Sequence, residues 1–236
     1  MKGICKRECL LAVLLAAGVG YADVVKSIAG EWTVSGEGLQ GCLRLPGTLA
    51  DAKLGRHMTE ADYLATTDVQ QEGALMREYL YLGKAVYSRE VEVPADATGK
   101  AAEVFLERVM WQSEVFFDGV SLGARDSLAT PHVHPVPARL MTPGRHRIEV
   151  AVDNSNLYAF SRWSHSYGPA MQSIWHGVLG RMELREANPL REARVFAEAG
   201  AREFRVEVPA GFEPSDRTVA ADGLDIVGFE SCASPY

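Results

Sequence analysis

The sequence lacks an excess of basic residues, a phosphate-binding glycine motif and a nucleophile elbow. Its 24 Lys and Arg are outnumbered by 31 Asp and Glu, giving a formal charge of -7. Since nucleic-acid affinity depends on neutralising phosphates with Lys and Arg, no nucleic-acid partner is expected. No glycine-rich loop follows a strand-like segment, and Gly-x-Ser-x-Gly is absent. Glycine and proline are scattered without a period, which excludes collagen-like and low-complexity chains.

Cysteine is also scarce, and two of the four cysteines lie near the N-terminus. Residues 1–22 carry Lys2, Lys6 and Arg7, then the apolar run 9–19, then small residues around position 22, a pattern typical of a secretory signal peptide. An uncleaved anchor is the weaker alternative, because a membrane-spanning helix needs about 20 apolar residues. We therefore expect a secreted or periplasmic protein with no membrane partner after signal cleavage. Cys42 and Cys232 remain after cleavage and could pair in an oxidising compartment, but nothing local indicates that they meet.

Apolar and polar residues alternate with period two along much of the remaining chain, which predicts short β-strands. The turn chemistry agrees, because Asp118-Gly119 and Pro143-Gly144 are typical hairpin and turn pairs. Residues 51–82 do not alternate and are interpreted as a long surface excursion with a helical turn near residues 59–63. Several short strands separated by turns indicate an all-β sandwich or barrel. The predicted strands are residues 31–35, 84–94, 101–108, 114–118, 145–153 and 178–184.

Five segments resemble, in the same order, the first domain of glycoside hydrolase family 2 proteins. They are residues 45–49 (LPGTL), 87–94 (YSREVEVP), 115–123 (VFFDGVSLG), 143–154 (PGRHRIEVAVDN) and 173–178 (SIWHGV). Each is weak alone because Asp-Gly hairpins and Pro-Gly turns are common, but five in order over residues 29–185 form a specific pattern. The family's first domain is a jelly-roll-like β-sandwich, similar to galactose-binding domains and called the sugar-binding domain. His176 departs from the Arg or Asn that the family carries there.

After the signal peptide (1–22), the resemblance implies two further parts: a sugar-binding β-sandwich (23–187) and an incomplete immunoglobulin-like β-domain (188–236). Strands 193–197, 204–208 and 224–229 are predicted in the last part. The family continues with a catalytic (β/α)₈ barrel, which alone takes about 250 residues. The Asn-Glu dipeptide that marks its acid/base glutamate is absent from this sequence. We therefore expect a chain truncated before the barrel, with no catalytic residue and no cofactor, and inactive alone.

Sugar recognition requires an aromatic ring and a few polar groups held in loops at the edge of a sandwich. Trp111 and Trp163 are the aromatic candidates, whereas Trp175 is expected in the core. In β-galactosidase-type family members, loops of the first domain reach the active site of the barrel. The resemblance extends that role to polar residues before the last motif, namely Asn154, Asn156, His165, Ser166 and Gln172.

His132 and His134 flank Val133 and would share one face of a strand, as a pair of zinc ligands does. No third ligand has a recognisable spacing, so no metal site is predicted. Because Pro131 and Pro135 bracket the pair, we interpret the segment as a rigid loop in which His132 contacts substrate or a neighbouring domain.

The acidic residues Glu103, Glu107 and Glu114 alternate along predicted strands and are interpreted as solvated positions rather than catalytic ones. The sequence therefore predicts the non-catalytic sugar-binding portion of a family 2 hydrolase that acts on β-linked glycans. The alternatives are a stand-alone secreted carbohydrate-binding module and a β-sandwich interaction domain. The expected partner is a carbohydrate, together with either a catalytic domain outside this chain or further copies forming a homo-oligomer.

Overall fold

The computed structural model describes residues 26–59, 78–127, 129–155, 158, 174–187, 194–197 and 204–207. One compact unit spans Asp23–Ala187. Strands β14 (Arg194–Ala197) and β15 (Phe204–Glu207) pair as an antiparallel ladder in a second unit. Within the described ranges, no helix is long and apolar enough to cross a membrane. The predicted signal peptide, the third strand of the second part and Cys232 lie outside the described residues.

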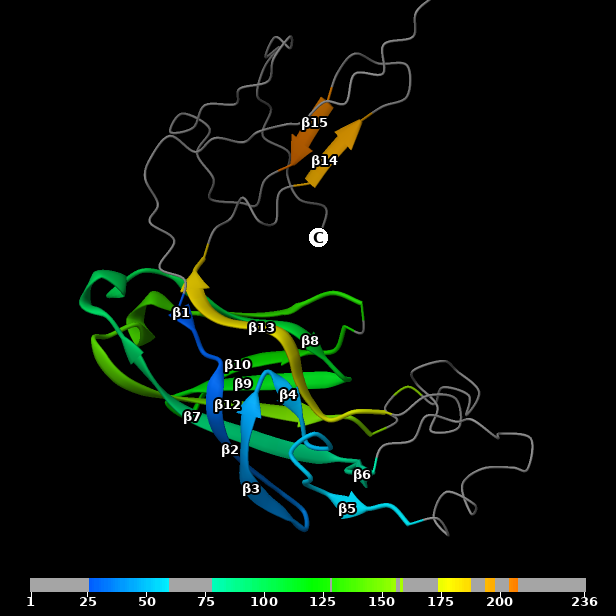
Figure 1. Cartoon of the computed structure of the whole chain (residues 1–236). Helices are drawn as coiled ribbons and strands as arrows, with labels where there is room; N and C mark the ends of the chain where they lie inside the picture. The colour runs from blue at the N-terminus through cyan, green and yellow to red at the C-terminus, as the bar shows by residue number, and fades with distance from the viewer. Residues whose placement is uncertain are drawn as a thin grey trace, which may run out of the picture. The chain divides into compact units, whose positions relative to one another are not determined.

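Two antiparallel sheets form the first unit, one on each side of the core (Figure 1). The larger sheet runs β10-β9-β12-β7-β2-β3, formed by β10 (Val120–Arg125), β9 (Gln112–Phe117), β12 (Gly144–Asp153), β7 (Lys84–Val93), β2 (Gly30–Gly36) and β3 (Leu39–Leu45). The smaller runs β1-β13-β8-β11, formed by β1 (Lys26–Ser27), β13 (Gly177–Glu186), β8 (Ala102–Val109) and β11 (His132–Val136), with β4 (Gly47–Thr48) also paired to β13. The all-β sandwich predicted from the sequence is confirmed.

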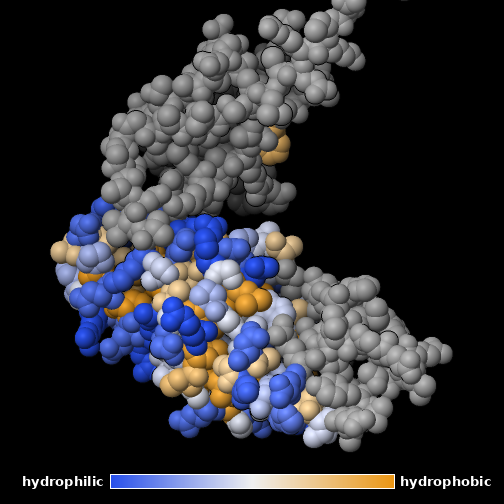
Figure 2. Space-filling model, viewed as in Figure 1, coloured by the Kyte–Doolittle hydropathy of each residue, from blue (hydrophilic) through white to orange (hydrophobic). Residues whose placement is uncertain are grey.

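Short elements complete the described part of the unit. Strands β5 (Arg56–His57) and β6 (Tyr79–Leu80) pair with each other, and two 3₁₀ turns follow β7 and β11, η1 (Ala95–Ala97) and η2 (Ala138–Leu140). The excursion predicted over residues 51–82 is described only at its two ends, and most of its predicted helical turn lies outside the described residues. The face seen in Figure 2 mixes hydrophilic residues with smaller hydrophobic areas.

Alternation along each strand fills the space between the sheets. In β9, Ser113, Val115 and Phe117 are buried, and the residues between them are partly exposed. Fully burying a large apolar side chain contributes about 1.5–3 kcal/mol, so these inward rows hold the two sheets together. The largest side chains enclosed in this way are Trp32, Tyr87 and Phe117.

The hairpin between β9 and β10 is confirmed. Asp118 and Gly119 both have positive φ angles, 47° and 78°, as a two-residue hairpin turn of this hand requires. The turn places Val120 opposite Phe117. Asp118 also accepts hydrogen bonds from the Arg147 backbone N–H (2.8 Å) and from His146 (2.6 Å), which fixes the turn against β12.

Apart from the two-residue strands, two strands of the sandwich differ from the sequence prediction. Strand β3 was not predicted, and the segment interpreted as a rigid loop around His132 is strand β11, paired with β8 from His132↔Leu106 to Val136↔Ala102. Pro135 lies within β11, which is an edge strand of its sheet. Proline is tolerated there because an edge strand has one side without ladder hydrogen bonds. The loop interpretation of this segment is therefore wrong.

Candidate functional site

Four chain segments meet at one end of the sandwich: residues 81–83 before β7, 110–111 between β8 and β9, 153–155 at the end of β12, and 174–176 before β13. Asn154 joins three of them and is fully buried. Its Oδ1 accepts from the Gly83 N–H (2.9 Å), and its Nδ2 donates to the carbonyls of Tyr81 (2.9 Å) and Trp175 (3.2 Å). The side-chain amide therefore ties three strand ends together.

Trp111 lies next to Asn154, so two of the predicted site residues are brought together. The Trp111 indole N–H donates to the Asn154 carbonyl (2.7 Å), and its backbone N–H donates to the Asp153 carbonyl (3.0 Å). The ring has no exposed surface and packs with Met110 and Ile174. In this conformation the indole offers no open face to a sugar, and its role in sugar binding stays a prediction.

His176, at the position where the sequence departs from its resemblance, is nearly enclosed beside Tyr87. The carbonyl of Gly83 can only accept, so His176 donates through Nε2 (3.1 Å). The other ring nitrogen, Nδ1, therefore accepts from the Tyr87 hydroxyl (2.6 Å). Burial lowers the pKa of His176 to about 4 and raises that of Tyr87. A buried histidine is tolerated inside the last motif because His176 and Tyr87 are both uncharged and hydrogen-bonded to each other.

The first and last motifs meet at Gly47 and Gly177. Thr48 and Gly177 are register partners between β4 and β13. Gly177 has φ +145°, and a Cβ there would lie 2.2 Å from the Gly47 carbonyl oxygen. Only glycine combines this backbone conformation with such a close approach. Two motifs separated by more than a hundred residues are thus in direct backbone contact, and the contact depends on glycine at position 177.

His132 lies inside the sandwich rather than on a loop surface. It has no exposed area, and neither has His134, which points to the same side of β11. Both rings face the hydroxyl of Ser113 on β9, at 2.6 and 3.0 Å. In the part of the chain that the structure describes, no group of three or more His, Cys, Asp or Glu is placed to hold a metal ion.

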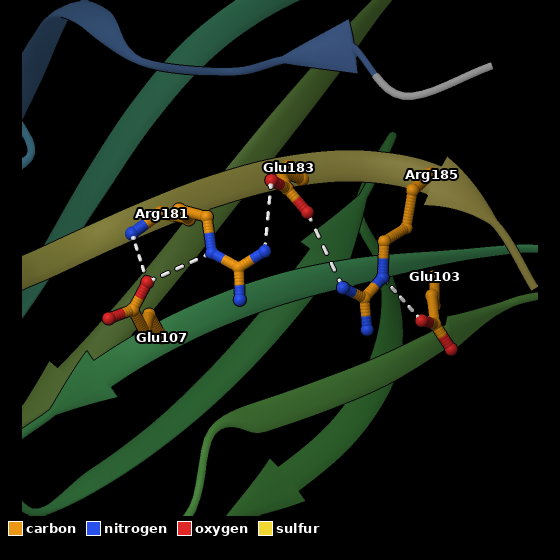
Figure 3. A network of polar contacts seen from close by, with 5 residues as sticks. All are labelled: Glu103, Glu107, Arg181, Glu183 and Arg185. Carbon is orange, nitrogen blue, oxygen red and sulfur yellow. Dashed lines mark hydrogen bonds and ion pairs between the residues drawn. The ribbon is translucent and has the colours of Figure 1, made fainter. Parts of the chain in front are cut away.

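A charged network covers the outer side of β8 and β13 (Figure 3). Arg181 bonds to Glu107 (3.0 Å) and lies 3.9 Å from Glu183, while Arg185 bonds to Glu183 (3.4 Å) and to Glu103 (2.5 Å). Both guanidinium groups lie over the Phe105 ring, at 5.0 and 4.0 Å from its centroid.

This network does not suit glycoside hydrolysis, which needs a carboxylic acid with a raised pKa. Hydrogen bonds from the backbone N–H and the side chain of Arg181 lower the pKa of Glu107 instead. Glu114 belongs to the other sheet and does not join the group. Glu103 is 8% exposed, so its interpretation as a solvated position is wrong: the Arg185 guanidinium, stacked on Phe105, pairs with it.

The remaining predicted site residues, Asn156, Trp163, His165, Ser166 and Gln172, lie outside the described residues. Sequence reasoning missed Tyr87 and Ser113, the polar partners of the buried histidines. Both are inward positions of alternating strands, and a polar residue at such a position requires a buried hydrogen-bond partner. A polar residue at an inward strand position was therefore the sequence signal that could have identified Tyr87 and Ser113.

No protein-family model and no curated protein matches this chain. Solved structures do. A family 2 β-galacturonidase from Eisenbergiella tayi bound to glycerol is similar at 18% identity and a TM-score of 0.46, over 78% of this chain and 26% of that one. The same enzyme bound to galacturonate is similar at 20% identity and a TM-score of 0.46, over 73% and 25%.

These two neighbours are family 2 enzymes. That is the family which the sequence motifs resemble. A Ruminococcus gnavus β-glucuronidase is also similar, at 16% identity and a TM-score of 0.42, over 56% of this chain and 22% of that one. The chain therefore spans about a quarter of the length of these solved proteins. At such identities the likeness concerns the fold, and the activity has to be argued from the residues.

Proposed function

We propose that residues 23–187 form the non-catalytic sugar-binding domain of a family 2-type glycoside hydrolase that acts on β-linked glycans. The observation that carries the proposal is the contact between the first and last motifs, where Gly47 meets Gly177 at a distance that no larger residue permits. The third motif forms the β9–β10 hairpin, and the fourth forms β12 and ends at Asn154. Four of the five motifs thus form turns, strands or close backbone contacts that their own residues explain.

The described carboxylates support a non-catalytic role. On the outer side of β8 and β13 they are held by two arginines, and the pKa of Glu107 is lowered rather than raised. A catalytic domain would therefore have to supply both the acid and the nucleophile. The convergence of strand ends around Asn154 and Trp111 would then place this end of the sandwich beside a glycan held by that domain.

We also infer that residues 1–22 direct export, on the strength of their charged start, short apolar run and small residues near position 22. Mass spectrometry of the protein recovered from an exporting bacterial host should give an N-terminus at Asp23. Recovery of the chain with Met1 intact from the cytosol would refute this inference.

The purified full chain should hydrolyse none of the aryl β-galactosides, β-glucuronides and β-galacturonides, and calorimetry should show saturable binding of β-linked oligosaccharides. Trp163→Ala should weaken that binding at least tenfold. Phe196→Ala, which removes an exposed ring from β14, is the matched control and should leave it unchanged. Turnover that a single carboxylate substitution abolishes would refute the non-catalytic assignment. A defined oligomer in sedimentation without sugar affinity would favour the interaction-domain alternative.

A further inference from the structure

Ser113, His132 and His134 form a buried cluster between the two sheets. Ser113 comes from β9 in the larger sheet, and both histidines come from β11 at the edge of the smaller sheet. None of the three has any exposed surface. Their polar atoms are therefore cut off from bulk water and must be satisfied within the protein.

Each imidazole ring lies between one backbone carbonyl and the same hydroxyl. His132 places Nε2 at 2.7 Å from the Ser127 carbonyl oxygen and Nδ1 at 2.6 Å from the Ser113 Oγ. His134 places Nδ1 at 3.0 Å from the Gly123 carbonyl oxygen and Nε2 at 3.0 Å from the same Oγ. A carbonyl only accepts, so in each ring the nitrogen that faces a carbonyl carries its hydrogen.

The number of polar hydrogens in the cluster determines how many of its hydrogen bonds can be made at once. Four contacts join the five groups, and each contact needs one hydrogen between its two heavy atoms. Two neutral imidazoles and one hydroxyl supply only three. The Ser113 hydroxyl can donate to one ring, and the other ring then turns a lone pair toward the lone pairs of the same oxygen. The neutral cluster is therefore one hydrogen short.

We propose that the Ser113–His132–His134 cluster is a built proton-binding site that takes up one proton. With that proton, one ring donates to the Ser113 Oγ, whose hydroxyl donates to the other ring, and all four contacts are made. A second proton is disfavoured, because it would place two positive rings on one oxygen and leave the hydroxyl hydrogen without an acceptor. The two histidines therefore share a single proton.

The surroundings set how strongly the proton is held. Burial opposes the charge, and so does Arg125 at the end of β10; together they lower the pKa of His134 to about 4. Burial lowers the pKa of His132 as well, while Asp126 acts in the opposite direction. The charged residues of β8 and β9 point to the outer sheet faces or are exposed; these are Glu103, Glu107, Arg108 and Glu114. Uptake is thus expected on the acid side of neutrality.

Histidine ring NMR on the full chain, labelled with ¹⁵N in the imidazoles, tests this site directly. Spectra from pH 8 downward should show His132 and His134 sharing a first step that amounts to one proton, separated from the second by more than one pH unit. His132→Gln and His134→Gln assign the signals. His57, an exposed ring that bonds to Glu78 (3.3 Å), lies outside the cluster and provides the reference signal in the same spectra.

The hydroxyl supplies the matched variants. Ser113→Ala should lower the apparent pKa of the first step by at least one unit, a tenfold loss of proton affinity, and Ser113→Thr should largely retain it. If Ser113→Ala does not fold, the titration of the wild-type protein still tests whether the two rings share one proton. The proposal is overturned if both rings stay neutral until the protein unfolds, if both protonate in one step, or if Zn²⁺ binds the two rings at neutral pH and moves both signals.

Discussion

Replacing Asn154 by Ala should destabilise the sandwich strongly, because its buried amide makes three hydrogen bonds to backbone groups of Gly83, Tyr81 and Trp175. Each backbone group left unsatisfied in the interior costs about 1–3 kcal/mol. The three together give a loss of about 3–9 kcal/mol, a large share of the roughly 5–15 kcal/mol that stabilises a domain. Urea unfolding followed by tryptophan fluorescence measures this loss, since Trp111 lies beside the substitution.

Two further variants test whether the Asn154 side-chain amide holds the strand ends together. Asn154→Asp preserves the shape but turns an oxygen toward the carbonyls of Tyr81 and Trp175, so it should lose at least as much stability as Ala. Thr33→Ala removes an exposed side-chain bond to the Ser88 carbonyl and should change stability by less than about 0.5 kcal/mol. A loss below about 1 kcal/mol for Asn154→Ala would show that the amide does not hold the strand ends together.

Three more outcomes are expected. The pKa of His176 is lowered to about 4 from an unfolded value of about 6.5. The stability that neutral His176 provides is therefore complete above pH 6.5, and the free energy of unfolding declines by up to about 1.4 kcal/mol per pH unit toward pH 4. His176→Asn should flatten that slope when unfolding is measured against pH. Arg185→Ala removes the 9%-exposed partner of Glu103 and should lower the free energy of unfolding in urea by about 3 kcal/mol. Arg145→Ala, at an exposed ion pair, should lower it by less than about 0.5 kcal/mol. Equal losses for the two variants would contradict this expectation. Gly177→Ala should prevent folding or lower the unfolding free energy by about 3 kcal/mol or more, judged by circular dichroism, because its Cβ would meet the Gly47 carbonyl oxygen.

The sequence determined the sandwich because period-two alternation is a local signal. Six strands and the Asp118-Gly119 turn are where alternation and turn chemistry predicted them, to within a few residues. Strand β3 was missed because Gln40, Gly41 and Cys42 interrupt its apolar pattern. Strand β11 was missed because two prolines signalled a loop, and only the position of β11 at the sheet edge makes Pro135 acceptable.

The candidate site depended on tertiary structure much more. Asn154 and Trp111 were predicted one by one, but their contact joins residues far apart in the chain, which no local pattern encodes. The same holds for Tyr87 with His176 and for Ser113 with its two histidines. Residue type and spacing determined which side chains face inward. The packing of one sheet on the other decided which of them meet, and therefore which hydrogens and charges they share.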